Sequence, residues 1–269
     1  ITLLFRNAQG SSRFVREQQL IGGKMLFNRI LYKKVAKAQL KNRWKTPVLS
    51  TLIILLLTLL LGSNDYISEH HSTSPDSVSV YTGDGISGAT IYDFFSPAEG
   101  TLGTVFFFVT LAVTGVLIQA SAHLYIRLSR TREPQKFGVF IEGFSNWANG
   151  ILGFLWYMLW VMLWTIVFFV PGIVKSIAYS QMFFILDEHP DIGVRKAMRV
   201  SKEITKGYKG ELFLMGLSFL GWEILNCLTM GILSLWLRPY ESMSYTNAYH
   251  ALMSRAIKSG EITEADLRK

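Results

Sequence analysis

Long apolar runs alternate with short charged segments over most of the chain. The runs at about 46–62, 102–126 and 212–237 each approach or exceed the length of about 20 residues that an α-helix needs to cross a bilayer. A further run, 151–186, is nearly twice that long and contains a single charged residue, Lys175. This pattern predicts an all-α fold, a polytopic bundle of membrane helices.

The longest run is expected to fold back on itself. Lys and Arg are concentrated on both of its flanks, at 127–136 and 195–209, and such concentrations mark the cytoplasmic side of a membrane protein. We therefore expect a hairpin of two spans, 151–170 and 172–187, that turns near Pro171-Gly172.

The last apolar run is divided by similar reasoning. A break near Gly231 gives spans at 212–229 and 232–253 and returns the C terminus to the cytoplasm, whereas a single span leaves it outside. The N terminus is expected in the cytoplasm as well. With the spans at 46–62 and 102–126, the total is about six in one integral membrane domain, 25–257, followed by a polar tail at 258–269.

Two basic segments, 26–45 and 194–206, have the pattern of amphipathic helices that lie in the membrane interface. Their apolar residues recur every three or four positions, while Lys and Arg lie mostly off that face. Trp44 is expected to anchor the first helix. The apolar faces are Phe27, Leu31, Val35 and Ala38 in the first helix, and Val194, Ala197, Met198, Ser201 and Ile204 in the second.

The segment 63–100 has six acidic residues and no Lys or Arg. Loops without positive charge belong on the non-cytoplasmic side, so we expect an extracellular loop, with a hairpin around Gly83-Asp84-Gly85. The adjacent His70 and His71 are a poor ligand set, and no metal site is predicted.

The first residue is Ile, and a Gly-Gly pair precedes Met25 closely. Such a pair can be encoded by a ribosome-binding sequence. One interpretation is that Met25 is the start and that 1–24 is a non-native or upstream extension, to be left out of fold reasoning. The alternative is a genuine basic extension.

Composition and missing motifs argue against several classes of function. The formal net charge is +8, but the basic residues flank apolar runs, where they favour anionic lipid headgroups at the cytoplasmic face over nucleic acid. The single cysteine, Cys227, excludes an intrachain disulfide. The motifs of zinc proteases, α/β-hydrolases and thiol redox proteins are missing from the sequence. We therefore expect neither an enzyme nor a bound cofactor.

Glu223 stands out as a carboxylate inside an apolar run. In a helix that starts at Leu212 it lies about 17 Å along the axis, near mid-membrane. If the chain turns at Gly231, Arg238 returns to a similar depth and can form an ion pair with it. Glu223 can instead be protonated or reach water, or it can couple proton or cation movement. Lys175, close to the other turn, is expected to snorkel to the outer headgroups.

Aromatic residues near the membrane fit two interpretations. Tyr240, Tyr245 and Tyr249 recur at spacings of five and four, and they fit either an interfacial aromatic belt or the lining of a cavity. A second set, Trp156, Trp160 and Trp164, shares one helical face, which predicts packing or lipid contact.

Several short motifs occur together in this chain: a basic start before the first span, a Pro-Gly break, a Glu-His-Pro turn, the stretch LSFLGW and a Pro-Tyr pair. Their residues include Pro171, Gly172, Pro190, Ser218, Gly221, Trp222 and Pro239. As a set they resemble a bacterial integral membrane family, common in Gram-positive bacteria, catalogued as domain of unknown function 975. His189 stands where Asn is usual in that family, and Ala248 where an aromatic residue is common.

The resemblance implies six spans with both termini inside. It also implies kinship with the six-span membrane domain attached to some bacterial glycerophosphodiester phosphodiesterases, whose chemistry resides in a separate soluble domain. Two function classes remain. The first is a non-enzymatic module of the bacterial cell membrane that binds lipid or protein partners or forms a homo-oligomer. The second is a transporter or exporter component, with Glu223, Arg238 and the tyrosine-rich last helix lining a path.

Overall fold

The computed structural model describes residues 20–21, 24–25, 27–62 and 101–268. The predicted extracellular loop and most of the N-terminal extension lie outside these residues. The described part is helical apart from one antiparallel pair of two-residue strands, β1 (Leu20–Ile21) and β2 (Lys24–Met25).

Ten α-helices and three short 3-10 helices are found in the described residues. In chain order they are α3 (Arg29–Leu40), α4 (Lys45–Gly62), α7 (Thr101–Arg130), α8 (Gly138–Glu142), η1 (Gly143–Asn146), α9 (Trp147–Val167), α10 (Phe169–Tyr179), α11 (Met182–Glu188), η2 (Pro190–Ile192), α12 (Val194–Ile204), α13 (Lys209–Leu228), α14 (Ser234–Lys258) and η3 (Glu264–Leu267).

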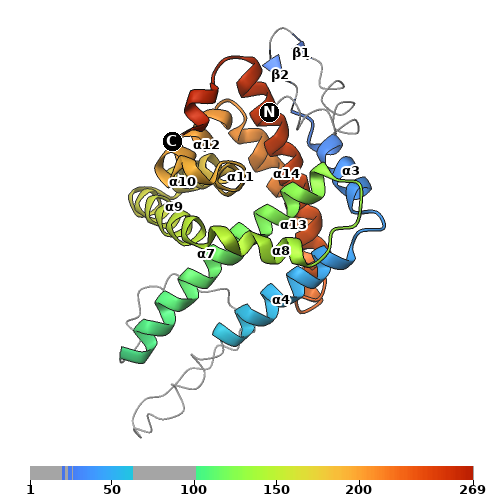
Figure 1. Cartoon of the computed structure of the whole chain (residues 1–269), viewed down its shortest axis with the longest axis vertical. Helices are drawn as coiled ribbons and strands as arrows, with labels where there is room; N and C mark the ends of the chain where they lie inside the picture. The colour runs from blue at the N-terminus through green and yellow to red at the C-terminus, as the bar shows by residue number, and fades with distance from the viewer. Residues whose placement is uncertain (1–19, 22–23, 26, 63–100, 269) are drawn as a thin grey trace, which may run out of the picture.

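Two helices extend away from the rest of the molecule. Figure 1 shows α4 and α7 projecting together at one end, while α10, α11, α12 and the C terminus gather at the other. The largest buried cluster lies at this second end and includes Met182, Ile185, Ile204 and Leu252. The core therefore forms where the short helices meet.

Within the described residues, four helical stretches are long and apolar enough to cross a membrane. They are Val105–Arg130, Gly138–Val167, Phe169–Glu188 and Lys209–Leu228; a fifth arises if Arg29–Leu40 and Lys45–Leu61, which meet at 100°, form one broken span. The six predicted spans are not confirmed, because α14 is not among these stretches. Charged residues and a buried Asn247 make α14 too polar.

The turn between α9 and α10 lies three residues before the predicted position. The helix is interrupted at Phe168, whose backbone is extended (φ −155°, ψ 133°). Pro171 instead falls in the first turn of α10, where its missing N–H leaves no hydrogen bond unmade. Gly172 packs on α9, because an added Cβ would lie 2.9 Å from the Thr165 Cα. The Pro-Gly pair thus stabilises the hairpin next to its turn.

Two glycines let α7 and α9 cross closely. A Cβ on Gly115 would lie 2.7 Å from the Gly150 carbonyl oxygen, and one on Gly150 would lie 2.8 Å from that of Gly115. Small residues at a crossing allow backbone contact between membrane helices. This contact places the start of α9 beside the middle of α7.

The first basic helix is shorter than predicted and buries a different face. Asn28 caps α3 by accepting from the Leu31 N–H at 3.0 Å, and the helix ends before Asn42, whose φ is 63°. Its buried residues are Tyr32, Ala36 and Leu40, not the apolar set expected to face lipid. α14 packs along the neighbouring stripe, so Leu31, Val35 and Ala38 stay half-buried or exposed, and contact of that face with lipid stays a prediction.

The second basic helix and the last break agree with the sequence. α12 buries Ala197, Met198, Ser201 and Ile204, and the Ser201 hydroxyl donates to the Ala178 carbonyl of α10 at 2.8 Å. The turn between α13 and α14 contains Gly231, with φ 82°. The apolar face of α12 and the break at Gly231 are confirmed, and both depended on local patterns. The location of α12 in the membrane interface stays a prediction.

Candidate functional site

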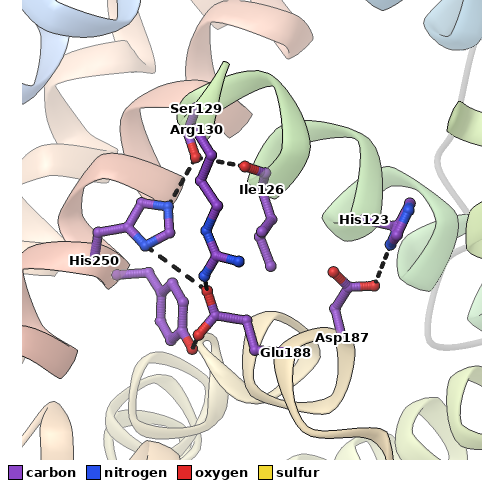
Figure 2. A network of polar contacts seen from close by, with 8 residues as sticks. His123, Ile126, Ser129, Arg130, Asp187, Glu188 and His250 are labelled. Atoms are coloured by element: carbon purple, nitrogen blue, oxygen red, sulfur yellow. Dashed lines mark hydrogen bonds and ion pairs between the residues drawn. The ribbon is translucent and has the colours of Figure 1, made fainter. Parts of the chain in front are cut away.

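Side chains of α7 and α14 meet the end of α11 (Figure 2). α11 has only seven residues and stops at Glu188, because His189 leaves the helical conformation and Pro190 follows. Pro190 begins η2, and its carbonyl accepts from the Asn149 side chain of α9 at 2.8 Å. Four consecutive residues, from Asp187 to Pro190, thus form a corner that several helices reach.

Glu188 is the centre of this corner. Arg130, in the last turn of α7, forms an ion pair with its Oε1, and the Tyr249 hydroxyl of α14 donates to its Oε2 at 2.7 Å. The Tyr249 ring is fully buried and stacks on Phe184. Since the Glu188 side chain is only 11% exposed, its charge requires these partners. We call Arg130, Asp187, Glu188, Tyr249 and His250 the Glu188 hub.

His250 extends the hub to Ser129. The Ser129 hydroxyl donates to the Ile126 carbonyl at 2.7 Å and lies 2.8 Å from His250 Nε2. The His250 Nδ1 lies 3.9 Å from Glu188 Oε1. The His250 ring therefore lies between a hydroxyl of α7 and the carboxylate at the end of α11.

Asp187 anchors the opposite side of the hub. Its carboxylate lies 2.9 Å from His123 Nδ1 of α7, and the Nε2 of the same ring lies 3.8 Å from Glu142 of α8. His123 thus lies between two carboxylates that come from different helices.

The same network reaches α3. Gln39 donates to the Ser129 carbonyl at 3.3 Å and accepts from the Asn247 amide at 2.9 Å. Arg43, buried in the turn after α3, donates to the Leu128 carbonyl at 3.2 Å near the end of α7. A cation is favourable there because the last carbonyls of a helix carry partial negative charge. α3 is therefore fixed against α7 and α14.

The order Ser129–His250–Glu188 is that of a serine-hydrolase triad, but the contacts differ. The serine hydrogen is engaged by a helix carbonyl. The distance of 3.9 Å between His250 and Glu188 exceeds that of a hydrogen bond. The Glu188 charge is already balanced by Arg130. These contacts fit a cross-link between helices better than an activated nucleophile.

A second charged cluster joins α13 to α14. Arg238 lies 3.5 Å from Glu223 and 3.4 Å from Glu241, so the predicted Glu223–Arg238 pair is confirmed and a second carboxylate accompanies it. The Asn226 amide donates to Glu223 at 3.4 Å. Arg238 is half exposed, so the cluster lies at the edge of the bundle and not in its centre.

The other predicted residues are dispersed. Tyr240 packs edge-on against Phe219, and Lys33 of α3 donates to the Ser218 carbonyl at 3.1 Å while its Nζ lies 3.6 Å from the Phe219 ring centre. Three more residues, Gly221, Trp222 and Pro239, take no part in either charged cluster; the first two are exposed and the third is buried in α14.

Lys175 lies against aromatic rings of its own hairpin. Its Nζ is 4.4 Å from the Trp164 ring centre and 6.0 Å from that of Tyr179. The expectation that Lys175 reaches the outer headgroups stays a prediction.

No group of three or more His, Cys, Asp or Glu residues in the described part of the chain is arranged to hold a metal ion. The His70-His71 pair lies outside those residues.

Residues 104–256 match a family described as protein of unknown function (DUF975). The chain belongs to the DUF975 family. The match includes the Glu188 hub and every family-motif residue predicted from Pro171 to Pro239, while the basic segment before the first span precedes it. Comparison with curated proteins and with solved structures gives no match.

Sequence reasoning named part of the hub without placing it. Tyr249 was a candidate residue and Glu188 belonged to the DUF975 motif. Arg130 was counted only among the basic residues at 127–136, and Ser129 and Asp187 were not singled out. The available signal was the Asp-Glu-His-Pro turn, where two carboxylates occur together at the end of an apolar helix.

We predict that Glu188→Gln destabilises the protein by about 1–3 kcal/mol, because the amide removes the charge that balances Arg130 while it still accepts from Tyr249. The matched control is Glu203→Gln, which removes an exposed pair with Lys206 and is expected to cost less than about 0.5 kcal/mol. The midpoint of thermal unfolding in neutral detergent measures both. Equal, small shifts for the two variants would contradict a structural role of the hub.

His189 provides a prediction about pH. Burial, the largest cause, lowers its pKa below the ordinary value of 6.5. The unfolded chain therefore takes up a proton near pH 6.5 that the folded chain does not, and stability falls as the pH drops through 6.5. In His189→Asn this contribution is absent, so acidification from pH 7.5 to 5.5 should lower the unfolding midpoint less than in the wild type. Parallel midpoint curves would refute this.

Proposed function

We propose that this DUF975 protein is a multi-pass protein of a bacterial plasma membrane that acts as a non-enzymatic module. It binds anionic lipid headgroups or a protein partner through its basic, cytoplasmic end. The four or five helical stretches that are apolar enough to cross a membrane support the membrane assignment. The involvement of the hub side chains in contacts between helices supports a scaffolding role.

The observation that carries the proposal is that acidic and basic side chains differ in the contacts they make. Acids such as Glu188, Glu223 and Glu241 take part in cross-links between or within helices. Many bases are exposed instead, and none of the ion pairs among the described residues involves Lys34, Lys37 or Lys41 of α3, or Arg195, Arg199 or Lys202 of α12. Such surplus positive charge attracts anionic partners.

In this proposal both termini lie in the cytoplasm. Six spans, as in the membrane domain of glycerophosphodiester phosphodiesterases, require α14 to cross as well. The hydroxyls of Ser244 and Thr246 donate to carbonyls of their own helix, which lowers the cost of placing them in a membrane. That kinship brings no catalysis to this chain.

Orientation can be measured with single cysteines. In a Cys227→Ser background, Lys34→Cys and Lys202→Cys place thiols on the exposed basic faces of α3 and α12. We expect a membrane-impermeant maleimide to label both in inside-out vesicles and neither in intact cells. Labelling in intact cells would place these faces outside and overturn the proposal. Labelling by a membrane-permeant maleimide in both preparations is the control for reactivity.

A transporter component is the second candidate, and the Glu223–Arg238–Glu241 cluster favours it. Three ionisable side chains of α13 and α14 lie close together there, and such groups within membrane helices mark ion or substrate paths. Two repeated halves with matching helix breaks would favour a transporter. The α9–α10 and α13–α14 turns do not support such a repeat, because their sequences are not similar.

Glu223→Gln separates a structural role from a coupling role. Because Arg238 keeps Glu241 at 3.4 Å, the variant should fold with a loss below about 1 kcal/mol. Glu223→Gln/Glu241→Gln removes both carboxylates and should destabilise clearly more. The measurements are the midpoint of thermal unfolding and the fluorescence of a pH-sensitive dye enclosed in proteoliposomes. A proton leak in wild-type liposomes that Glu223→Gln abolishes without loss of stability would establish coupling; equal traces would exclude it.

A further inference from the structure

Three bases form a row along the outer side of α12. Arg195, Arg199 and Lys202 are exposed, and their spacings of four and three residues place them within a sector of about 60° around the helix axis. The opposite side of the helix, which includes Ala197 and Ile204, is buried in the bundle. We call Arg195, Arg199 and Lys202 the α12 ridge, and it extends over roughly 10 Å along the helix.

The α12 ridge takes part in none of the ion pairs among the described residues. Other bases in and beside α12 have partners within the chain. Lys196 donates to the Ala265 carbonyl of η3 at 2.9 Å, and Lys206 lies 3.9 Å from Glu203, the acidic residue of α12. The fold thus provides counterparts for Lys196 and Lys206 but pairs no carboxylate with the ridge in this part of the chain.

Arg195, at one end of the ridge, is held by α9. Its guanidinium carbon lies 5.0 Å from the Trp156 ring centre, and the ring attracts the cation in such a contact. An arginine that lies over a ring still donates N–H groups from the edge of its plane, where a carboxylate can accept two of them. Because the ring already restricts Arg195, less conformational freedom is lost when an anion binds.

The surface around the ridge is of the kind that faces water. In the stretch 175–212, which the structure describes without a gap, no large apolar side chain is exposed. The neighbouring helices differ, since Leu159 of α9 and Leu220 of α13 are each about half exposed. A helix that lies in the membrane interface inserts its apolar side chains among the lipids. The apolar side of α12 is instead occupied by the bundle.

We propose that the α12 ridge is a docking site for an acidic α-helix of a protein partner in the cytoplasm. Figure 1 shows α12 at the end of the molecule opposite to the projecting helices α4 and α7, and α4 leads into the predicted extracellular loop. Carboxylates at spacings of four and three residues on the partner helix match the spacing of the ridge. This inference rests on the proposed function, since it needs α12 in the cytoplasm, and it deepens that function by assigning a protein, not lipid, to this surface.

The test is a titration of the full chain in phosphatidylcholine nanodiscs with two fluorescein-labelled peptides, followed by fluorescence anisotropy at low ionic strength. Both peptides are rich in alanine and have about 20 residues, enough to form a helix. They contain the same number of Glu residues, which lie on one helical face in the first peptide and all around the helix in the second. We expect the first to bind roughly tenfold more tightly, at about threefold for each of two further ion pairs.

Removing the charges of the ridge should weaken binding of the first peptide. Arg195→Gln/Arg199→Gln/Lys202→Gln is expected to raise the dissociation constant by about threefold for each lost pair, or roughly thirtyfold in total. Should the triple variant not fold, Arg199→Gln alone tests the ridge, because Arg199 is exposed. A dissociation constant about threefold higher supports the site, and an unchanged one refutes it.

The matched control is Arg132→Gln/Lys136→Gln/Lys258→Gln, which removes the same charge from exposed positions outside both α3 and α12. It should change the dissociation constant by less than about threefold, since distant surface charges are screened. Equal weakening by the two triple variants would overturn the site, because it would indicate diffuse attraction to positive charge anywhere on the protein. Equal affinity of the wild type for the two peptides, or no binding of either, would overturn it too.

A membrane surface is the alternative occupant of the ridge. In the Cys227→Ser background, a fluorophore is attached through Arg199→Cys, and the protein is placed in nanodiscs whose lipids carry a nitroxide at the headgroup. We expect iodide in solution to quench the fluorophore and the nitroxide lipids to quench it little. Strong quenching by the nitroxide lipids would place the ridge against the headgroups and overturn the docking of a protein there.

These outcomes are independent of the cysteine labelling. A protein that is labelled from the cytoplasmic side but binds both peptides equally keeps the proposed function and loses this site. A protein that is labelled from outside loses the proposed function, whatever the peptide titrations show.

Discussion

The carboxylate of Glu188 is the interaction on which the arrangement of the short helices depends. α11 is a seven-residue helix between two breaks, too short to be stable alone. Its position is set at its last residue, where Arg130 of α7 and Tyr249 of α14 bind the two oxygens of one carboxylate. Because only η2 separates α12 from α11 and α12 packs on α11, the same contact helps to set the direction of the basic helix α12.

The polar character of α14 follows from its position. A helix in lipid gains little from burying apolar side chains, since lipid is itself apolar, and packing and hydrogen bonds between helices take over. α14 supplies such bonds along its length, from Arg238 near its start to Asn247 and Tyr249 in its second half. It contacts α3, α7 and α11 through polar side chains, and these side chains lower the mean hydropathy of the helix. The low hydropathy of α14 is therefore a consequence of its central role in the bundle.

The sequence predicted best those features that depend on neighbours along the chain. The break at Gly231, the buried face of α12 and the pair Glu223–Arg238 all follow from spacing within one or two helices, and the structure has them. The pair could be placed because a tight turn brings residues on either side of it to similar depth. Charge patterns alone, however, did not distinguish a helix that crosses the membrane from a helix that packs inside the bundle.

Features that depend on distant segments were not predictable in the same way. The buried face of α3 is decided by α14, more than 200 residues later, as in the Gln39–Asn247 bond. His123 contacts Asp187, which lies 64 residues later in the chain, and no sequence periodicity connects the two positions. The turn at Phe168 was missed because Pro-Gly is read as a break, whereas proline in the first turn of a helix is compatible with that helix.

The distribution of charge gives the molecule its asymmetry. Glu188, Glu223 and Glu241 form ion pairs with arginines of α7 and α14, whereas Glu142 and Glu203 stay exposed at the surface. The exposed bases of α3 and α12 then have no internal counter-charge within 4 Å among the described residues.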